Sequence, residues 1–354
     1  MNIKINKKIY GPISQTYFIA DVAANHDGSL KKAKKLIRLA AESGANAVKF
    51  QNFKANTIVS DFGFKSLRNK LSHQSKWKKS IFQVYRDAEL PLSWTRDLKE
   101  TCDKYNIDYF TAPYDLEMIP VLNKYMPAWK VGSGDITWHD NIIAMAKTKK
   151  PLLIATGASE LKEIKIILKK VLKINKQVVL MQCNTNYTAD EKNFDYINLD
   201  CLKTFKKEFP KVSLGLSDHT FGSETVLGAI ALGAKFIEKH FTDKNSLDGP
   251  DHKFSMNPVT WSKMIESARK LERSIGSTEK KIEFNEKDTV ILQRRSIRLS
   301  REMKKGEKIK NSDLVYLRPC PKNSLSPYEK NLILNKTINK NLKFHHPIGL
   351  KDVK

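Results

Sequence analysis

Short apolar runs alternate along this chain with longer segments in which apolar residues recur every three or four positions. Short apolar runs are typical of buried parallel strands, and the longer period is typical of helices that cover a sheet. In the first such unit, an apolar run at 17–22 precedes a helical pattern over 29–42, which Ser29 can cap and which Ser43 and Gly44 can end. The pattern therefore predicts a series of β/α units.

The same unit recurs about eight times along the first three quarters of the chain. Further strands are predicted at 47–50, 108–111, 128–132, 152–155, 178–181, 212–216 and 236–240, with helical patterns between them. Eight alternating strands and helices over roughly 250 residues is the usual size of a (β/α)₈ TIM barrel. We therefore predict an α/β fold with a TIM barrel over residues 17–280.

Two segments depart from this alternation. Isoleucines alternate with polar residues over 1–16 around a Gly-Pro pair, which predicts a short hairpin or cap before the barrel. Residues 52–75 are polar and rich in lysine, and we interpret them as a long loop over the barrel mouth, followed by helices near 77–87 and 93–105.

A small domain is predicted after the barrel, over residues 281–354, which include a charged linker. Two β-like runs, 293–299 and 309–317, are separated by a turn at Lys305 and Gly306. About 70 residues suffice for a compact β-rich module.

The charge balance is strongly basic. The 354 residues include 63 Lys and Arg against 38 Asp and Glu, a formal net charge of +25. A basic nucleic-acid-binding protein on a degenerate barrel would explain this charge. However, the lysines are spread along the chain, and no arginine-rich arm, zinc finger or aromatic RNA-binding motif accompanies them. We therefore expect a composition bias that also attracts an anionic substrate, and no nucleic-acid partner.

Cysteine usage and hydropathy predict a soluble cytoplasmic protein. Cys102, Cys183, Cys201 and Cys320 are widely separated and form no paired motif, so neither a disulfide framework nor a zinc site is expected. The first residues lack the apolar core of a signal peptide, and no stretch approaches the ~18 apolar residues of a membrane helix.

Polar or small residues follow nearly every predicted strand. They are Asp21, Lys49, Thr111, Ser133, Gly134, Asp135, Thr156, Gly157, Asn184, Thr185, Asn186, Tyr187, Ser217, Asp218, His219, Glu238, Lys239 and His240. Barrel strands are otherwise buried and apolar, and their carboxyl ends all open on the face where active sites lie. This concentration predicts one shared site at the barrel mouth.

Two histidines end consecutive predicted strands, because His219 and His240 lie 21 residues apart, about one β/α repeat. Neutral imidazole is the commonest metal ligand, so two such groups on neighbouring strands could share one ion. The alternative is that each is an ordinary structural histidine at a strand end.

Two lysines occupy strand positions that would face the same site. Lys49 and Lys130 would lose hydration there unless they bind an anion, which favours a phosphate or carboxylate ligand. A Schiff-base lysine is the competing interpretation, and it requires an apolar setting that deprotonates the amine. Nearby Gly132, Gly134 and Gly157 could let backbone amides approach an anion, or could serve ordinary tight turns.

Several motifs resemble the sialic acid synthase family, a group of nonulosonic acid synthases. They read FIADVAANHDGSL, GANAVKFQ, WKVGSGD, GLSDHTFGSETVLGAIALGAKFIEKHF and DGPDHKFSMNP, and they cover most of the barrel. Residues 294–319 resemble the antifreeze-like (SAF) domain that follows the barrel in those enzymes.

The resemblance implies that phosphoenolpyruvate condenses with an N-acetylated hexosamine, such as N-acetylmannosamine, to give a nine-carbon 2-keto acid and phosphate. It also implies a divalent metal, most often Mn²⁺ with Mg²⁺ or Co²⁺ as alternatives, and a domain-swapped homodimer. Open alternatives are a legionaminic or pseudaminic acid synthase that uses a diacetamido hexose, and another phosphoenolpyruvate-dependent sugar-acid synthase.

By the same resemblance, individual residues acquire expected roles. The metal ligands would be His219 and His240, and Asp21 or Asp135 would orient or deprotonate a water molecule. The expected substrate-binding residues are Lys49, Gln51, Thr111, Lys130, Ser133, Thr185, Tyr187, Ser217, Asp251 and, from the partner subunit, Arg318. Four positions depart from the family pattern: Asp21 replaces a usual glutamate, Ala112 and Ala155 replace hydroxyl residues, and Thr185 replaces an asparagine.

Overall fold

The computed structural model describes residues 1–67, 77 and 79–354. The chain forms two compact units, Met1–Gly276 and Ser277–Lys354. No helix among the described residues is long and apolar enough to cross a membrane.

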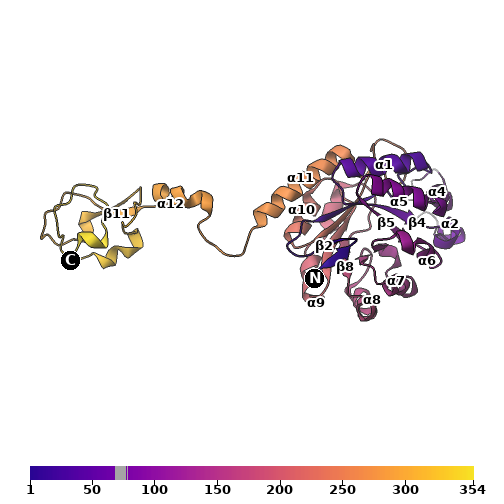
Figure 1. Ribbon diagram of the computed structural model, residues 1–354, viewed down its shortest axis with the longest axis horizontal. Coiled ribbons are helices and arrows are strands. Elements are labelled where there is room, and N and C mark those ends of the chain that lie inside the picture. Colours follow the sequence, from indigo (N-terminus) through magenta and orange to yellow (C-terminus); the bar gives the residue numbers. More distant parts are fainter. Residues whose placement is uncertain (68–76, 78) are drawn as a thin grey trace. The chain divides into compact units, whose positions relative to one another are not determined.

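The first unit is built on eight parallel strands (Figure 1). They are β3 (Tyr17–Asp21), β4 (Ala47–Asn52), β5 (Asp108–Pro113), β6 (Trp129–Val131), β7 (Leu152–Ala155), β8 (Val178–Cys183), β9 (Ser213–Asp218) and β10 (Phe236–His240). Their spatial order is β5-β4-β3-β10-β9-β8-β7-β6, and β5 and β6 at its two ends lie in contact. The strands therefore close into the predicted barrel, in which each strand lies beside its sequence neighbour.

Helices surround the strands (Figure 1). The longer ones are α1 (Leu30–Glu42), α5 (Thr95–Lys104), α7 (His139–Lys147), α8 (Leu161–Ile174), α9 (Cys201–Glu208), α10 (Glu224–Ala231) and α11 (Pro258–Ile275). Ser29 caps α1 as predicted, because its side chain accepts a hydrogen bond from the backbone N–H of Lys32. Ala33, Leu36, Ile37 and Ala40 form the buried face of α1, at the spacing of an amphipathic helix.

The amino-terminal end of the barrel is closed by apolar side chains. An antiparallel hairpin of β1 (Ile3–Ile5) and β2 (Lys8–Tyr10) precedes the barrel. Ile3 and Ile5 are fully buried and pack with Tyr17, Phe110, Phe236 and other residues of the barrel interior. Water is therefore excluded from that end, and polar side chains gather at the opposite end.

The expected loop over residues 52–75 is more regular than the sequence predicts. It contains two short helices, α2 (Ala55–Ile58) and α3 (Asp61–Ser66), and residues 68–75 lie outside the described part. Ser60 stabilises the start of α3 by accepting a hydrogen bond from the N–H of Gly63. The predicted helix near 77–87 begins at Ile81 as α4 (Ile81–Asp87), where Ser80 and Gln83 form a capping box.

The second unit has its own core and little regular structure. It contains α12 (Lys287–Gln293) and one antiparallel pair, β11 (Ser296–Leu299) with β12 (Leu314–Leu317). Both strands are shorter than the predicted runs, because turns and isolated bridges make up much of the unit. Ile297, Leu299, Ile309, Ile333, Ile338 and Ile348 lie fully buried in its core.

A buried ion pair joins β9 and β10, next to the two histidines, on the outer side of the barrel. Lys239 on β10 is in register with Asp218 on β9, and their side chains form an ion pair with about 1% exposure each. The hydroxyl groups of Thr220 and Thr225 also donate to Asp218. These two charges face the outer side of the barrel, so the expectation that they belong to the shared site at the mouth is wrong.

Removing one partner of this ion pair should destabilise the barrel. Lys239→Met leaves the Asp218 carboxylate buried without its cation, so the free energy of unfolding should fall by about 3–5 kcal/mol. Arg96→Met is the control, because Arg96 and Glu100 form an exposed pair whose loss should cost less than about 1 kcal/mol. Urea titrations followed by tryptophan fluorescence report on the barrel, since all five tryptophans precede residue 277. If both variants lost the same free energy of unfolding, the buried ion pair would not have the stabilising role that we assign to it.

Candidate active site

A cavity of about 330 Å³ opens at the carboxyl ends of the strands. Its walls include eleven of the fourteen predicted site residues: Asp21, Lys49, Gln51, Lys130, Ser133, Asp135, Thr185, Tyr187, Ser217, His219 and His240. The structure therefore brings together residues that are spread over more than 200 positions of the sequence.

Strand alternation explains which side chains reach the cavity. Lys49 and Gln51 lie two residues apart on β4, so both point to the same side of the strand. Glu238 and His240 on β10 obey the same rule, as do Ser217 and His219 on and just after β9. The residues between them, such as Lys239, point outward.

The floor of the cavity is a buried network of charges. Lys49 Nζ lies 2.7 Å from Asp21 Oδ2 and 3.3 Å from Glu238 Oε1. Lys130 Nζ lies 3.4 Å from the same Glu238 oxygen, to which Ser217 also donates a hydrogen bond of 3.1 Å. Each of the four charged side chains is at most 4% exposed. Glu238 thus bridges two ammonium groups that would otherwise repel each other.

The electrostatics of this network follow from burial and pairing. Burial alone would lower the pKa of Lys49, but Asp21 and Glu238 outweigh burial and raise it. Burial lowers the pKa of Lys130, where the attraction of Glu238 is partly cancelled by Lys49. Burial opposes ionisation of Glu238, yet Lys130 and Lys49 bring its pKa down to about 2. Glu238 therefore stays ionised at neutral pH.

Glycines let other groups approach the cavity closely. A Cβ atom on Gly132 would lie 2.6 Å from the Tyr114 hydroxyl oxygen, and one on Gly157 would lie 2.6 Å from Thr185 Cγ2. The backbone N–H of Gly157 donates to Ser133 Oγ at 3.0 Å. Neither Gly132 nor Gly157 has a positive φ, so close packing, and no left-handed turn, explains these two glycines.

The two imidazoles face each other in the cavity wall, with ring centroids 5.3 Å apart. His219 Nδ1 lies 2.7 Å from the carbonyl oxygen of Asn184, which can only accept, so this nitrogen carries the proton and Nε2 keeps a lone pair. His240 Nδ1 has no hydrogen-bond partner in the part of the chain that the structure describes, and Asp251 Oδ2 lies 3.9 Å away.

Both histidines are neutral at physiological pH. Burial lowers the pKa of His219 to about 3, with a further contribution from His240, and burial lowers the pKa of His240 to about 4. Two neutral imidazoles, one of them with a buried nitrogen that lacks a partner, fit a divalent metal ion. Within the described residues there is no cluster of three or more His, Cys, Asp or Glu ligands that could hold a metal ion.

Asp135 ends a single 3₁₀ turn, Ser133–Asp135, beside Lys130. Burial raises its pKa to about 6, although Lys130 opposes this shift. A carboxyl group with such a pKa changes its charge close to neutral pH, which suits a general base.

Three predicted residues lie elsewhere. Asp251 lines an adjoining compartment and accepts a hydrogen bond of 3.1 Å from the backbone N–H of Ala24. The structure does not bring Thr111 to the cavity, because its buried hydroxyl donates to Asn52 Oδ1 at 2.7 Å. Arg318 follows β12 in the second unit, and its contribution to the site of a partner subunit stays a prediction.

The loop that carries Asp251 is held by a buried histidine. His252 is fully buried, with Nε2 3.0 Å from Asp27 Oδ1 and Nδ1 2.6 Å from Thr242 Oγ1. Asn25 adds hydrogen bonds of 2.9 Å to the carbonyl oxygen of Phe241 and to Ser255 Oγ. The loops that follow β3 and β10 are thereby joined, which positions Asp251 beside His240.

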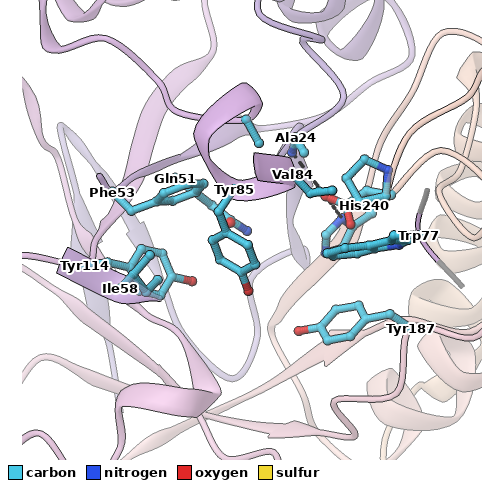
Figure 2. A pocket seen from close by; sticks show the side chains of 13 residues that line it. Ala24, Gln51, Phe53, Ile58, Trp77, Val84, Tyr85, Tyr114, Tyr187 and His240 are labelled. Atoms are coloured by element: carbon cyan, nitrogen blue, oxygen red, sulfur yellow. Dashed lines mark hydrogen bonds and ion pairs between the residues drawn. The ribbon is translucent and has the colours of Figure 1, made fainter. Parts of the chain in front are cut away.

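The adjoining compartment is mainly aromatic and aliphatic. Its cavity volume is about 170 Å³, and it shares six residues with the charged cavity: Gln51, Ile58, Tyr85, Tyr114, Tyr187 and His240. Figure 2 shows the rings of Tyr85 and Tyr114 on one side of this space and that of Tyr187 on the other.

Sequence reasoning missed the roles of Glu238, Tyr85 and Tyr114. Glu238 could have been found, since it precedes His240 by two residues on a predicted strand and must face the same side. Tyr85 on α4 and Tyr114 after β5 carry no such signal, because only the folded loops bring them to the cavity.

Comparisons with known proteins agree with this geometry. The sequence profile of the NeuB family matches residues 36–280. The chain is 34% identical to an N,N'-diacetyllegionaminic acid synthase of Campylobacter jejuni, over 94% of this chain and 98% of that protein. It is 31% identical to a pseudaminic acid synthase of the same organism, over 97% of this chain and 96% of that protein. The crystal structure of an N-acetylneuraminic acid synthetase from Leptospira borgpetersenii superposes with a TM-score of 0.70 at 25% identity, covering 82% of this chain and 95% of that one.

Anion binding should respond in opposite directions to changes in the cations and in Glu238. Lys49→Met or Lys130→Met removes a cation and should weaken the binding of inorganic phosphate about tenfold or more. Glu238→Gln keeps the shape but removes a competing negative charge, so phosphate affinity should be retained or increased. Isothermal titration calorimetry measures both effects, and Lys65→Met on the exposed surface is the control. The charge network would not govern binding if Lys130→Met and Glu238→Gln shifted the affinity in the same direction.

Proposed function

The chain belongs to the NeuB family, and we propose that it condenses phosphoenolpyruvate with an N-acetylated hexosamine to give a nine-carbon 2-keto acid and phosphate. Membership of this family makes it a phosphoenolpyruvate-dependent synthase of a sugar acid. The observation that carries the proposal is one cavity in which two neutral imidazoles face a buried pair of lysines. N-acetylmannosamine and diacetamido hexoses are the candidate acceptors.

The lysines suit the binding of phosphoenolpyruvate, which carries a phosphate and a carboxylate. Lys49 and Lys130 supply two cations, while Ser133 and Ser217 supply hydroxyl donors on the same wall. The contacts of both ammonium groups with the ionised Glu238 disfavour the Schiff-base alternative, because they stabilise the charged form of each lysine.

The histidines suit a divalent metal ion, with Mn²⁺ the expected one and Mg²⁺ or Co²⁺ as alternatives. His219 and His240 would hold it, and as a Lewis acid it would polarise the aldehyde of the open-chain sugar. Asn184 fixes the tautomer of His219 for this purpose.

In the proposed reaction, one carbon–carbon bond forms and one water molecule is added. C3 of phosphoenolpyruvate bonds to C1 of the sugar, the aldehyde oxygen becomes a hydroxyl group by taking up a proton, and C2 gains positive character. Water adds to C2 and loses a proton to a carboxylate, for which Asp135 is better suited than Asp21, because Asp21 is already paired with Lys49. Cleavage of the bond between C2 and the phosphate oxygen, with transfer of the C2 hydroxyl proton to the leaving phosphate, releases hydrogen phosphate and leaves the ketone.

Metal removal should abolish phosphate release. Treatment with EDTA should inactivate the wild type and added Mn²⁺ should restore it, whereas His219→Ala or His240→Ala should stay more than about 100-fold slower at the same Mn²⁺ concentration. Electron paramagnetic resonance of free Mn²⁺ measures binding independently of turnover. His139→Ala, which alters a histidine at the start of α7, should behave as wild type. Full activity of the EDTA-treated enzyme would refute the metal proposal.

The acid side of the pH–rate profile should report on Asp135. Because burial raises the pKa of Asp135 to about 6, its basic form is lost as the pH falls through that value. The kcat of the wild type should therefore fall about tenfold per pH unit below pH 6. Asp135→Asn should be slower by about 10²–10⁴ and should lack this acid limb. Asp140→Asn, at an exposed position of α7, is the matched control. If the kcat of Asp135→Asn still fell below pH 6 as in the wild type, Asp135 would not be the general base.

A further inference from the structure

Four aromatic rings meet at the wall that carries the two imidazoles. They belong to Tyr187, His219, His240 and Phe254, and every pair of them is in ring contact, with centroid distances from 4.4 Å to 6.2 Å. The first three line the charged cavity, whereas Phe254 is only 2% exposed and does not belong to the lining of either space. Phe254 therefore supports the imidazoles from the interior of the protein.

The loop after β10 fixes Phe254 in this position. The backbone N–H of Met256 donates to the carbonyl oxygen of His240 at 2.8 Å, so the chain two residues beyond Phe254 is tied to the end of the strand. The carbonyl oxygen of Ser255 accepts a hydrogen bond of 2.6 Å from Asn245 Nδ2. The ring of Phe254 is thus placed by hydrogen bonds of the backbone next to it.

The two imidazoles are oriented by different means. A histidine that binds a metal usually donates its second N–H group to a carbonyl or carboxylate oxygen, and this bond fixes the ring. His219 follows the rule through the carbonyl oxygen of Asn184. In the part of the chain that the structure describes, His240 Nδ1 has no such partner, and the Asp251 and Asp21 oxygens lie 3.9 Å and 3.6 Å from its Nδ1 and Nε2. Both distances exceed hydrogen-bond length, so packing is what orients His240.

Phe254 makes the shortest of the ring contacts that His240 has among the described residues. Their centroids lie 4.9 Å apart at an interplanar angle of 63°, whereas those of His219 and Tyr187 lie 5.3 Å and 6.1 Å from His240. In an edge-to-face contact the positive edge of one ring meets the negative face of the other. Such a contact restrains rotation of the imidazole in addition to filling space.

We propose that Phe254 is the positioning residue that orients His240 for a divalent metal ion. It takes the place of the hydrogen bond by which Asn184 orients His219. The inference rests on the proposed function, because it takes the two histidines as metal ligands. Phe254 acts through the imidazole alone, by holding the ring in one orientation before the ion arrives.

Loss of the ring should weaken metal binding. Phe254→Leu keeps an apolar side chain but removes the edge-to-face contact, so the dissociation constant for Mn²⁺ should rise about tenfold, as for other residues that support a metal ligand. Electron paramagnetic resonance of free Mn²⁺ measures this constant without any substrate. At saturating Mn²⁺ the variant should recover the wild-type kcat to within about threefold, with an unchanged KM for phosphoenolpyruvate.

Phe241→Leu is the matched control. Phe241 directly follows His240 and is fully buried, but its ring packs against Trp261 at a centroid distance of 5.5 Å. Its replacement should lower the midpoint of urea unfolding much as Phe254→Leu does, yet leave the Mn²⁺ affinity unchanged. Phe254→Tyr retains the ring and should retain the affinity. Should Phe254→Leu fold poorly, Phe254→Met supplies a longer apolar side chain without a ring.

The outcomes separate the two proposals. Wild-type Mn²⁺ affinity in folded Phe254→Leu overturns the role of Phe254 and leaves the proposed function intact. An equal loss of affinity in Phe241→Leu also overturns that role, because general loosening of the core would then be the cause. Weaker binding in Asp251→Asn, with none in Phe254→Leu, assigns the orientation of His240 to the carboxylate instead. Absence of Mn²⁺ binding by the wild type overturns the metal site of the proposed function, and this inference with it.

Discussion

The bridge that Glu238 makes between Lys49 and Lys130 is the interaction on which the cavity depends. Two ammonium groups and two carboxylates lie at most 4% exposed, where unpaired charges would be prohibitively costly. Pairing keeps Glu238 ionised and keeps Lys49 charged, so both ammonium groups are held beside carboxylates inside a closed barrel. An incoming phosphate or carboxylate can then exchange one set of charge contacts for another without entering an apolar space.

The rest of the barrel holds this network in place. The hairpin seals the amino-terminal end with Ile3 and Ile5, which leaves the carboxyl end as the place where polar side chains meet. On the outer side, the pair of Lys239 and Asp218 joins the two strands that carry the imidazoles. His252 in turn joins the loops after β3 and β10. Rigid supports of this kind position reacting groups before a substrate arrives.

Two adjoining spaces at the carboxyl ends of the strands differ in the chemistry of their walls. The floor of the charged cavity is formed by the network of Lys49, Lys130 and Glu238, whereas the wall of the adjoining compartment includes Phe53, Ile58, Val84 and Ala88. That wall comes from an insertion between a strand and its following helix, where barrel enzymes vary without disturbing their core.

The amino-acid sequence by itself determined the alternation of strands and helices, the closed barrel, and the strand ends where His219, His240, Lys49 and Lys130 meet. These features follow from hydrophobic periodicity, which is local and can be read along the chain. Only the tertiary structure decided that Glu238 bridges Lys49 and Lys130, that Asp218 pairs with Lys239, and that the Thr111 hydroxyl donates a hydrogen bond to Asn52. It also brought Tyr85 and Tyr114 to the cavity. The physical reason is that a side chain's partners depend on barrel closure and loop packing, which join residues far apart in sequence.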